Sequence, residues 1–294
     1  MKQRLKWKKI SEMEYVLETD YLSLKQIYES GQAFRWIKLS DDDYIAIHED
    51  RWIRVGQQGS FLRFTNASRR ELTKVWTPYF DLDRDYSVIR KYYRGLDGYL
   101  DEAMDHGEGI RILKQSLLEI IITFIISANN HIPRIKTAID KISRFAGSKI
   151  GEVSGQEIIA FPTLEALMEI SDEQWKEVKL GYREAYIRKS LKMIKNKEVD
   201  LAKIKKLSTL EAKKQLMKLS GVGDKVADCI LLYGMGRMDT FPVDVWMKRV
   251  MNCHYDIGEE ESVQSIRQRG MDVFGETAGI AQQYLFYYER TKGR

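Results

Sequence analysis

Cysteine is nearly missing from this sequence, since only Cys229 and Cys253 occur among 294 residues. Two cysteines cannot build a disulfide framework, so we expect the protein to fold in a reducing compartment. They also exclude a four-cysteine zinc or iron–sulfur site, and no other cluster of metal ligands is visible. We therefore expect neither a metal nor a cofactor.

The sequence also has no long apolar run. The most apolar stretch, LLEIIITFIISA (117–128), is too short to span a bilayer and contains Glu119. We interpret it as a buried helix. The first ten residues lack the apolar core of a secretory signal. The expectation is a cytoplasmic protein that does not enter a membrane.

Proline is scarce too, and the four prolines are scattered rather than gathered in a linker. With no repeats or low-complexity segments, 294 residues predict one large domain or two to three modest ones. A 44% hydrophobic share is enough for real cores. The net charge of +5 permits a polyanionic partner, but a solvated basic surface explains it equally well.

The first hundred residues predict strands and the remainder predicts helices. Short aromatic and β-branched runs at 33–40, 44–50, 51–58 and 60–65 are separated by turn-rich residues. This spacing predicts an antiparallel meander. From about Asp85 onward the pattern is helical and stays helical, so the fold class is α+β.

One helical hairpin is especially clear. Ser208 and Glu211 form a capping-box signature, and a glycine ends the helix. The next helix should begin at Asp224 or Lys225. The predicted apolar positions of the first helix are Leu210, Leu216, Met217 and Leu219, and those of the second are Val226, Cys229, Ile230 and Tyr233.

The connection Gly221-Val222-Gly223 presents bare backbone N–H groups at a helix start, which suits one phosphate of a nucleic acid. An ordinary short connection between helices is an equal alternative on this segment alone. A dinucleotide-binding GxGxxG is excluded, because Val226 stands where the third glycine belongs and no strand precedes it.

Lys225 and Asp244 are the candidate catalytic pair. The helix that begins near Lys225 carries the chain away from this point. The extended segment from Gly236 to Pro242 is long enough to bring the chain back, so that Asp244 can lie beside Lys225. A neutral lysine amine could attack C1′ of a deoxyribose, expel the base and form a Schiff base. The carboxylate could stabilise positive charge on the sugar. Asp244 is also the expected N-cap of a helix over Val245–Met251, and the two roles are compatible.

Six segments together resemble the 8-oxoguanine DNA glycosylase family of the helix-hairpin-helix superfamily. They are SGQAFRW (30–36), SANNHIPRI (127–135), LGYREAY (180–186), LSGVGDKVADC (219–229), FPVDV (241–245) and AGIAQQYLF (278–286). The resemblance implies a TATA-binding-protein-like sheet domain over 1–107, a helical subdomain over 108–132 plus 225–294, and a second over 133–224. It also implies a bifunctional glycosylase and β-lyase that removes oxidised guanine opposite cytosine, with Lys225 as the Schiff-base lysine and Asp244 as the catalytic aspartate.

The resemblance further implies which residues read the flipped base. Gly31 matches the residue whose carbonyl senses the N7 hydrogen of 8-oxoguanine. Gln282 and Phe286, four residues apart on one helix face, would read and stack on the base. Cys229, one turn beyond Lys225, would stack on its other face. Taken alone, Phe286 and Cys229 are more typical of core residues, and Gly31 is more typical of a turn before a strand.

Other matching residues concern the rest of the duplex. By resemblance, Asn129 fills the hole left by the base, Tyr182 wedges the stack, and Arg134 and Arg183 hydrogen-bond the opposite cytosine. The implied partner is double-stranded DNA containing oxidised guanine, bound by a monomer that would be nucleoid-associated in a prokaryote.

Three positions depart from the family pattern. Trp246 stands where many relatives have a histidine, Tyr233 where we expect methionine, and His131 where we expect a third asparagine. Two alternatives remain: an alkylpurine glycosylase without lyase activity, against which Lys225 argues, and a non-catalytic helix-hairpin-helix DNA-binding protein. The endonuclease III type is disfavoured because its four-cysteine cluster is missing.

Overall fold

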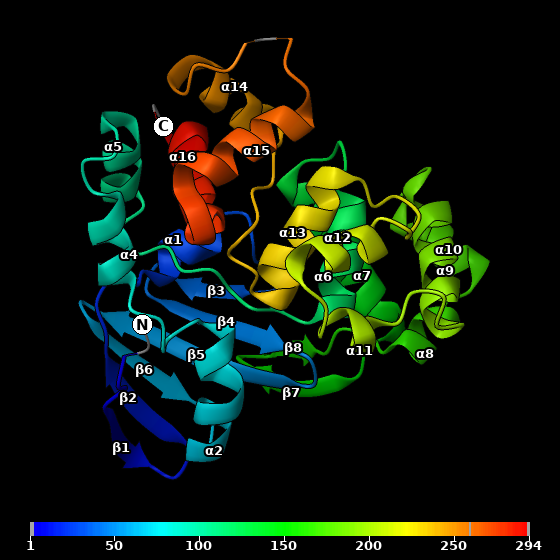
Figure 1. The fold of residues 1–294 in the computed structure, drawn as a ribbon. Coiled ribbons are helices and arrows are strands. Elements are labelled where there is room, and N and C mark those ends of the chain that lie inside the picture. The colour runs from blue at the N-terminus through cyan, green and yellow to red at the C-terminus, as the bar shows by residue number, and fades with distance from the viewer. Residues whose placement is uncertain (1–2, 259, 293–294) are drawn as a thin grey trace.

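The computed structural model describes residues 3–258 and 260–292, and its N-terminal part is built on a six-stranded antiparallel sheet (Figure 1). The strands are β1 (Trp7–Ser11), β2 (Glu14–Glu18), β3 (Ile37–Ser40), β4 (Asp43–His48), β5 (Arg51–Gln58) and β6 (Phe61–Thr65). Their order across the sheet is β1-β2-β6-β5-β4-β3. The predicted meander is confirmed as β3 to β6. The sequence did not predict β1, an edge strand exposed at every residue except the half-buried Trp7.

Short helices pack against this sheet: α1 (Leu24–Glu29), α2 (Arg69–Glu71), the π-helix η1 (Leu72–Trp76) and α3 (Thr77–Tyr79). Leu24 and Ile27 of α1 join Trp76 and Phe80 in one buried core with Phe64 of the sheet. The prediction that helices begin only near Asp85 is therefore wrong, because these elements are too short to show a helical period.

The rest of the chain is mainly helical, as the α+β prediction required. Its helices are α4 (Tyr86–Tyr93), α5 (Gly98–His106), α6 (Leu117–Ser127), α7 (Ile132–Ala146), α8 (Leu164–Met168), α9 (Asp172–Val178), α10 (Arg183–Lys195), α11 (Leu201–Ile204), α12 (Thr209–Leu216), α13 (Asp224–Met235), α14 (Val245–His254), α15 (Val263–Phe274), the 3₁₀ helix η2 (Gly275–Thr277) and α16 (Ala278–Thr291). The division into residues 1–107, 108–132 plus 225–294, and 133–224 stays a prediction.

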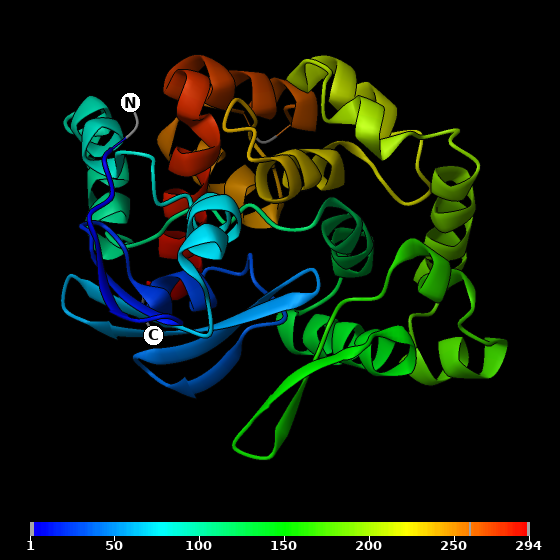
Figure 2. The same cartoon turned by 90° about the horizontal axis from the view of Figure 1, so that it is seen from below.

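One hairpin interrupts this helical part and corrects the expectation of helices throughout. Strands β7 (Lys149–Val153) and β8 (Gln156–Ile159) extend beside the main sheet (Figure 2). Their turn is Ser154-Gly155, with both residues at positive φ, which is the geometry that two-residue hairpin loops favour. Gly151 faces the Trp52 indole, and a Cβ there would lie 2.2 Å from Trp52 Nε1. Only glycine permits this approach.

Helix α6 confirms the prediction for the apolar stretch and lies at the centre of the helical part, against α13, α7 and α10. Its one charged residue, Glu119, pairs with Arg35 at 3.4 Å, and both side chains are 7% exposed. Burial raises the pKa of the Glu119 carboxyl, while the Arg35 charge opposes this. The pair joins the N-terminal part to α6. Within the described residues, no helix combines the length and apolarity needed to cross a bilayer.

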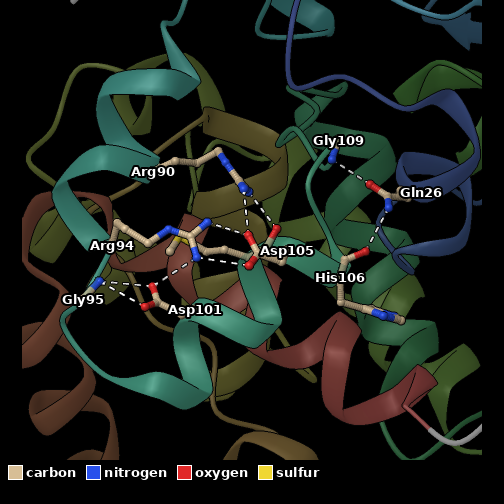
Figure 3. A network of polar contacts seen from close by, with 9 residues as sticks. Gln26, Arg90, Arg94, Gly95, Asp101, Asp105, His106 and Gly109 are labelled. Carbon is tan, nitrogen blue, oxygen red and sulfur yellow. Dashed lines mark hydrogen bonds and ion pairs between the residues drawn. The ribbon is translucent and has the colours of Figure 1, made fainter.

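Helix α1 is anchored at a point that matters for the site, because it leads directly into Gly31. Gln26 donates from Nε2 to the His106 carbonyl at 2.9 Å and accepts from the Gly109 amide at 2.7 Å (Figure 3). Next to this bridge, Asp105 of α5 pairs with Arg90 and Arg94. The two Gln26 bonds fix α1 to the last residue of α5 and to the segment that follows it, and the Asp105 pairs hold α4 and its end against α5.

Candidate active site

The helical hairpin leading to Lys225 forms as predicted. Ser208 and Glu211 make a capping box at α12, and α13 begins at Asp224. Helix α12 ends at Leu216, however, well before the glycines. Leu210 is 61% exposed and Met217 is 39% exposed, so the predicted apolar positions are wrong at both residues. The buried face instead holds Thr209, Ala212, Lys213 and Leu216, and it is thus less apolar than a regular stripe.

The hairpin turn exposes its backbone. Gly221 has φ +80°, and a Cβ on it would lie 2.8 Å from the Tyr186 ring, so both its conformation and its packing favour glycine. Val222 is buried. Gly223 is the N-cap of α13, is exposed, and has open space where a side chain would be. No side chain at Gly223 therefore covers the start of α13, and the phosphate-binding role of the turn stays a prediction.

A buried charge network beneath the hairpin was not predicted. Asp228, 1% exposed, accepts from Lys213 at 3.0 Å, Arg267 at 2.8 Å and Thr240 at 2.8 Å. Lys213 also pairs with Asp224 at 3.1 Å. The network joins α12, α13 and α15. Asp228 is one turn from Asp224 on α13, but nothing in the sequence places a lysine and an arginine from other helices against it.

Lys225 lies in the first turn of α13, against an aromatic wall. Its Nζ is 5.2 Å from the centroid of the Phe124 ring on α6. Phe124 in turn stacks on Tyr233, with centroids 5.4 Å apart and an angle of 9° between the planes. Cys229, one turn further along α13, is buried. The amine is therefore held at the end of a packed stack rather than extended into solvent.

Asp244 is the N-cap of α14, as predicted, and uses one oxygen for that role. Its Oδ1 accepts from the amides of Trp246 at 3.0 Å and Met247 at 2.9 Å. Its Oδ2 accepts no hydrogen bond from a described residue. One carboxylate oxygen thus remains available for chemistry.

The Cys229 thiol is influenced by both candidate catalytic residues. Burial raises the pKa of this thiol to about 11, the Lys225 charge lowers it, and the Asp244 charge raises it. Among the described residues, no ion pair joins Lys225 to Asp244. The joint action of the amine and the carboxylate stays a prediction.

Three of the four residues proposed to contact the flipped base come from two distant segments. Gly31 has φ +82°, and a Cβ on it would lie 3.6 Å from Phe286 Cε1 and 2.9 Å from Arg290 Nη1. Gln282 is 3% exposed, and its Oε1 is buried without a hydrogen-bond partner in the described structure. An unsatisfied buried amide oxygen is costly, and it indicates a ligand that donates to it. Gly31 and Phe286 are therefore brought together, with Gln282 one turn away on α16.

The residues expected near the opposite base lie around the end of α6. Asn129 is exposed with φ +49°, and Tyr182 is 54% exposed. Arg134 is exposed and donates to the Lys179 carbonyl at 3.2 Å. Arg183 is only 7% exposed and donates from Nε and Nη2 to the Ala128 carbonyl and from Nη2 to the Asn129 carbonyl, so in this structure it braces the Asn129 segment.

The positions that depart from the family pattern have clear local surroundings. His131 is the N-cap of α7. Trp246 is partly buried, with the Arg249 guanidinium 5.3 Å from its ring centroid. Tyr233 is buried and donates to Gln283, a residue that the sequence did not single out. Its neighbour Gln282 attracted attention only through the resemblance.

Comparison with known proteins gives one consistent result. Residues 14–121 match the model of the 8-oxoguanine DNA glycosylase N-terminal domain, and residues 122–276 match that of the HhH-GPD superfamily of base excision DNA repair proteins. A probable N-glycosylase/DNA lyase of Methanothermobacter thermautotrophicus is 29% identical over 76% of this chain and 76% of its own length. The N-glycosylase/DNA lyase of Arabidopsis thaliana is 28% identical over 91% of this chain and 77% of its own length.

Solved structures agree. The 8-oxoguanine glycosylase/lyase of Clostridium acetobutylicum, in complex with double-stranded DNA containing cytosine opposite 8-oxoguanine, is 39% identical. It superposes with a TM-score of 0.92, over 100% of this chain and 99% of that chain. The 3-methyladenine DNA glycosylase of Archaeoglobus fulgidus, 20% identical with a TM-score of 0.75, shares the fold.

Proposed function

This chain belongs to the 8-oxoguanine DNA glycosylase family of helix-hairpin-helix base-excision proteins, and from that membership we propose how it works. The protein is an 8-oxoguanine DNA glycosylase and lyase that acts on double-stranded DNA. Its catalytic groups are Lys225 and Asp244. The observation that carries this proposal is the placement of the Lys225 amine in the first turn of α13 against the Phe124 ring, together with an Asp244 carboxylate that caps α14 through Oδ1 and leaves Oδ2 without a donor among the described residues.

The chemistry uses the neutral Lys225 amine as the nucleophile. Its nitrogen forms a bond to C1′ of the flipped nucleotide, and the bond between C1′ and the base breaks, so the base leaves with the electron pair. Asp244 Oδ2 stabilises the positive charge that develops on the sugar. Loss of the amine protons and opening of the sugar give the Schiff base. Removal of a C2′ proton then expels the 3′ phosphate, which is the lyase step.

Recognition of the flipped base uses contacts to its N7 hydrogen, to its Watson–Crick edge and to its two faces. The Gly31 carbonyl accepts from the N7 hydrogen that 8-oxoguanine has and guanine lacks. Gln282 satisfies its buried Oε1 on the Watson–Crick edge of the base, where a purine N–H can donate. Phe286 and Cys229 stack on opposite faces. The fold supports this arrangement because Gly31 and Phe286 are already neighbours.

Binding of the duplex uses the hairpin and the end of α6. The turn Gly221-Val222-Gly223 holds one phosphate without regard to sequence. The Val222 amide already donates to the Leu219 carbonyl at 3.2 Å, so the contacts come from the amides of the two glycines. Asn129 enters the hole left by the base and Tyr182 wedges the stack. Arg134, which extends into solvent, makes the first contact with cytosine. Arg183 then gives up its hydrogen bond to the Asn129 carbonyl and donates to the cytosine instead.

A lesion panel tests this function. Duplexes with 8-oxoguanine opposite each of the four bases are incubated with the protein, and base release and strand cleavage are measured separately. We expect both activities, with release opposite cytosine faster than opposite adenine, and Arg134→Ala should reduce that preference. Base release without cleavage would indicate a monofunctional glycosylase, and binding without release would indicate a non-catalytic protein. Equal rates opposite cytosine and adenine would contradict the role of the arginines.

A further inference from the structure

Tyr233 and Gln283 connect α13 and α16 to the loop that contains Gly31. The Tyr233 hydroxyl donates to Gln283 Oε1, and Gln283 Nε2 donates to the Ser30 carbonyl at 3.0 Å. Tyr233 is 6% exposed, Gln283 0% and Ser30 1%. A continuous buried chain of two hydrogen bonds therefore ends on the residue before Gly31.

The carbonyls on both sides of Gly31 are all occupied. The Glu29 carbonyl accepts from Arg290, the Ser30 carbonyl from Gln283, and the Gln32 carbonyl from Gln115 at 2.8 Å. In residues 29–32, the Gly31 carbonyl is the one that accepts no hydrogen bond from a described residue. The loop thus holds its backbone firmly while leaving one acceptor for a ligand.

These bonds fix the direction of that acceptor. Each peptide unit is planar, so holding the Ser30 carbonyl also fixes the plane that contains the Gly31 amide. Gly31 itself has φ +82°, a conformation that glycine alone adopts readily and that is free to drift without such restraint. Gln115 holds the Gln32 carbonyl and so restrains the peptide unit after Gln32. The Gly31 carbonyl belongs to the peptide unit between these two restrained units.

We propose that Tyr233 is a positioning residue that acts through Gln283 to aim the Gly31 carbonyl, and so sets how strongly the protein distinguishes 8-oxoguanine from guanine. This inference rests on the proposed function, in which that carbonyl reads the N7 hydrogen. It also accounts for the tyrosine at a position where methionine is expected, because a thioether cannot donate to Gln283.

The hydroxyl can be tested apart from the ring. The Tyr233 ring stacks on Phe124, which lies beneath the Lys225 amine, and Tyr233→Phe keeps that stack while it removes the donor. Gln283→Leu removes the bond to Ser30 and leaves the hydroxyl in place. Tyr93→Phe is a matched control. Tyr93 is also buried, and its hydroxyl bonds the Phe274 carbonyl and Thr277. Neither of these two residues takes part in the proposed chemistry.

The measurement is binding without turnover. In a Lys225→Gln background, dissociation constants are measured for duplexes that carry 8-oxoguanine or guanine opposite cytosine. Discrimination is the dissociation constant for the guanine duplex divided by that for the 8-oxoguanine duplex. Tyr233→Phe should reduce this ratio about fivefold, the effect expected of one neutral hydrogen bond. Tyr93→Phe should leave the ratio unchanged. The double variant with Gln283→Leu should match Gln283→Leu alone, since the two residues act in series.

Each outcome has a distinct meaning. A parent protein that binds both duplexes equally overturns the proposed function itself. If the parent protein distinguishes 8-oxoguanine from guanine and Tyr233→Phe does so equally well, the positioning role of Tyr233 is overturned while the proposed function stands. Fully additive losses in the double variant contradict action through Gln283. If Gln283→Leu does not fold, Gln283→Glu replaces it, because it keeps the acceptor for Tyr233 and loses the donor to Ser30.

Discussion

At the residue scale, the two oxygens of Asp244 have different surroundings. Oδ1 caps α14 through two backbone amides, and Oδ2 accepts no hydrogen bond from a described residue. The cap orients the carboxylate, and the second oxygen faces the reacting sugar in our proposal. The sequence predicted the cap, because an aspartate before an apolar helix start is a typical N-cap, and the catalytic role stays a prediction.

Asp244→Asn separates these jobs, since asparagine caps a helix as well as aspartate does but carries no charge. We expect the variant to fold and to bind 8-oxoguanine·C duplex as tightly as the parent. Its base-release rate should fall by about 100-fold or more, the scale of losing a preorganised electrostatic group. Single-turnover kinetics and a binding titration measure the two quantities. An unchanged rate would contradict the catalytic role of Asp244.

At the scale of elements, the hairpin is held by charges that the sequence does not reveal. Lys213 is 6% exposed and Arg267 comes from α15, and both converge on Asp228. The sequence predicted α12 and α13 from capping and glycine signals, and both helix starts agree with the structure, whereas α12 ends at Leu216, before the glycine that was expected to end it. It failed at Leu210 and Met217 because a buried lysine, rather than an apolar stripe, fills part of the α12 interface.

Asp228→Ala should therefore destabilise the protein strongly. Removing the carboxylate takes the acidic partner from Arg267 and one of two acidic partners from the buried Lys213, and breaking a buried ion pair costs about 3–5 kcal/mol in comparable cases. Urea unfolding measures the change. Asp140→Ala is the control, because its pair with Arg144 is largely exposed and is worth about 0–1 kcal/mol. If the two variants lose similar stability, the network does not hold the hairpin.

Lys225, Asp244 and the glycine turn were singled out from local chemistry, whereas Phe286 looked like core until the resemblance assigned a role to it and to Gln282. Tyr233 was noted only as an apolar helix position and as a departure from the family pattern, and Gln283 and Phe124 were not singled out. Their contacts join segments up to 253 positions apart. Long-range contacts of this kind leave no local period or spacing.

At the scale of the whole molecule, positive charge is concentrated beside the hairpin. Residues 183–218 contain twelve lysines and arginines against four acidic residues, a net charge of +8 in a chain whose total is +5. The remainder is thus slightly acidic. The sequence showed only mild basicity overall, and the fold adds that this segment contains α10 and α12, with Tyr186 of α10 packed on Gly221.

Exposed lysines of this segment should contact phosphates of the duplex beside the lesion. Lys189 shares a helix face with Tyr182 and Tyr186, and Lys214 and Lys218 lead into the hairpin. Replacing these three lysines by glutamine should reduce the slope of log affinity against log salt by up to ~2.7, about 0.9 for each phosphate lost. Replacing the exposed Lys8, Lys74 and Lys91 is the control. Equal slopes in the two triple variants would place the duplex elsewhere.

The most direct test of the account is to trap its covalent intermediate. Borohydride reduces a Schiff base between an amine and the sugar, so protein incubated with 8-oxoguanine·C duplex should become joined to DNA, and peptide mapping should place the adduct on Lys225. Lys225→Gln should give no such product while it still binds the duplex. Trapping at the level of the parent protein in Lys225→Gln, or an adduct on another lysine, would contradict the central claim.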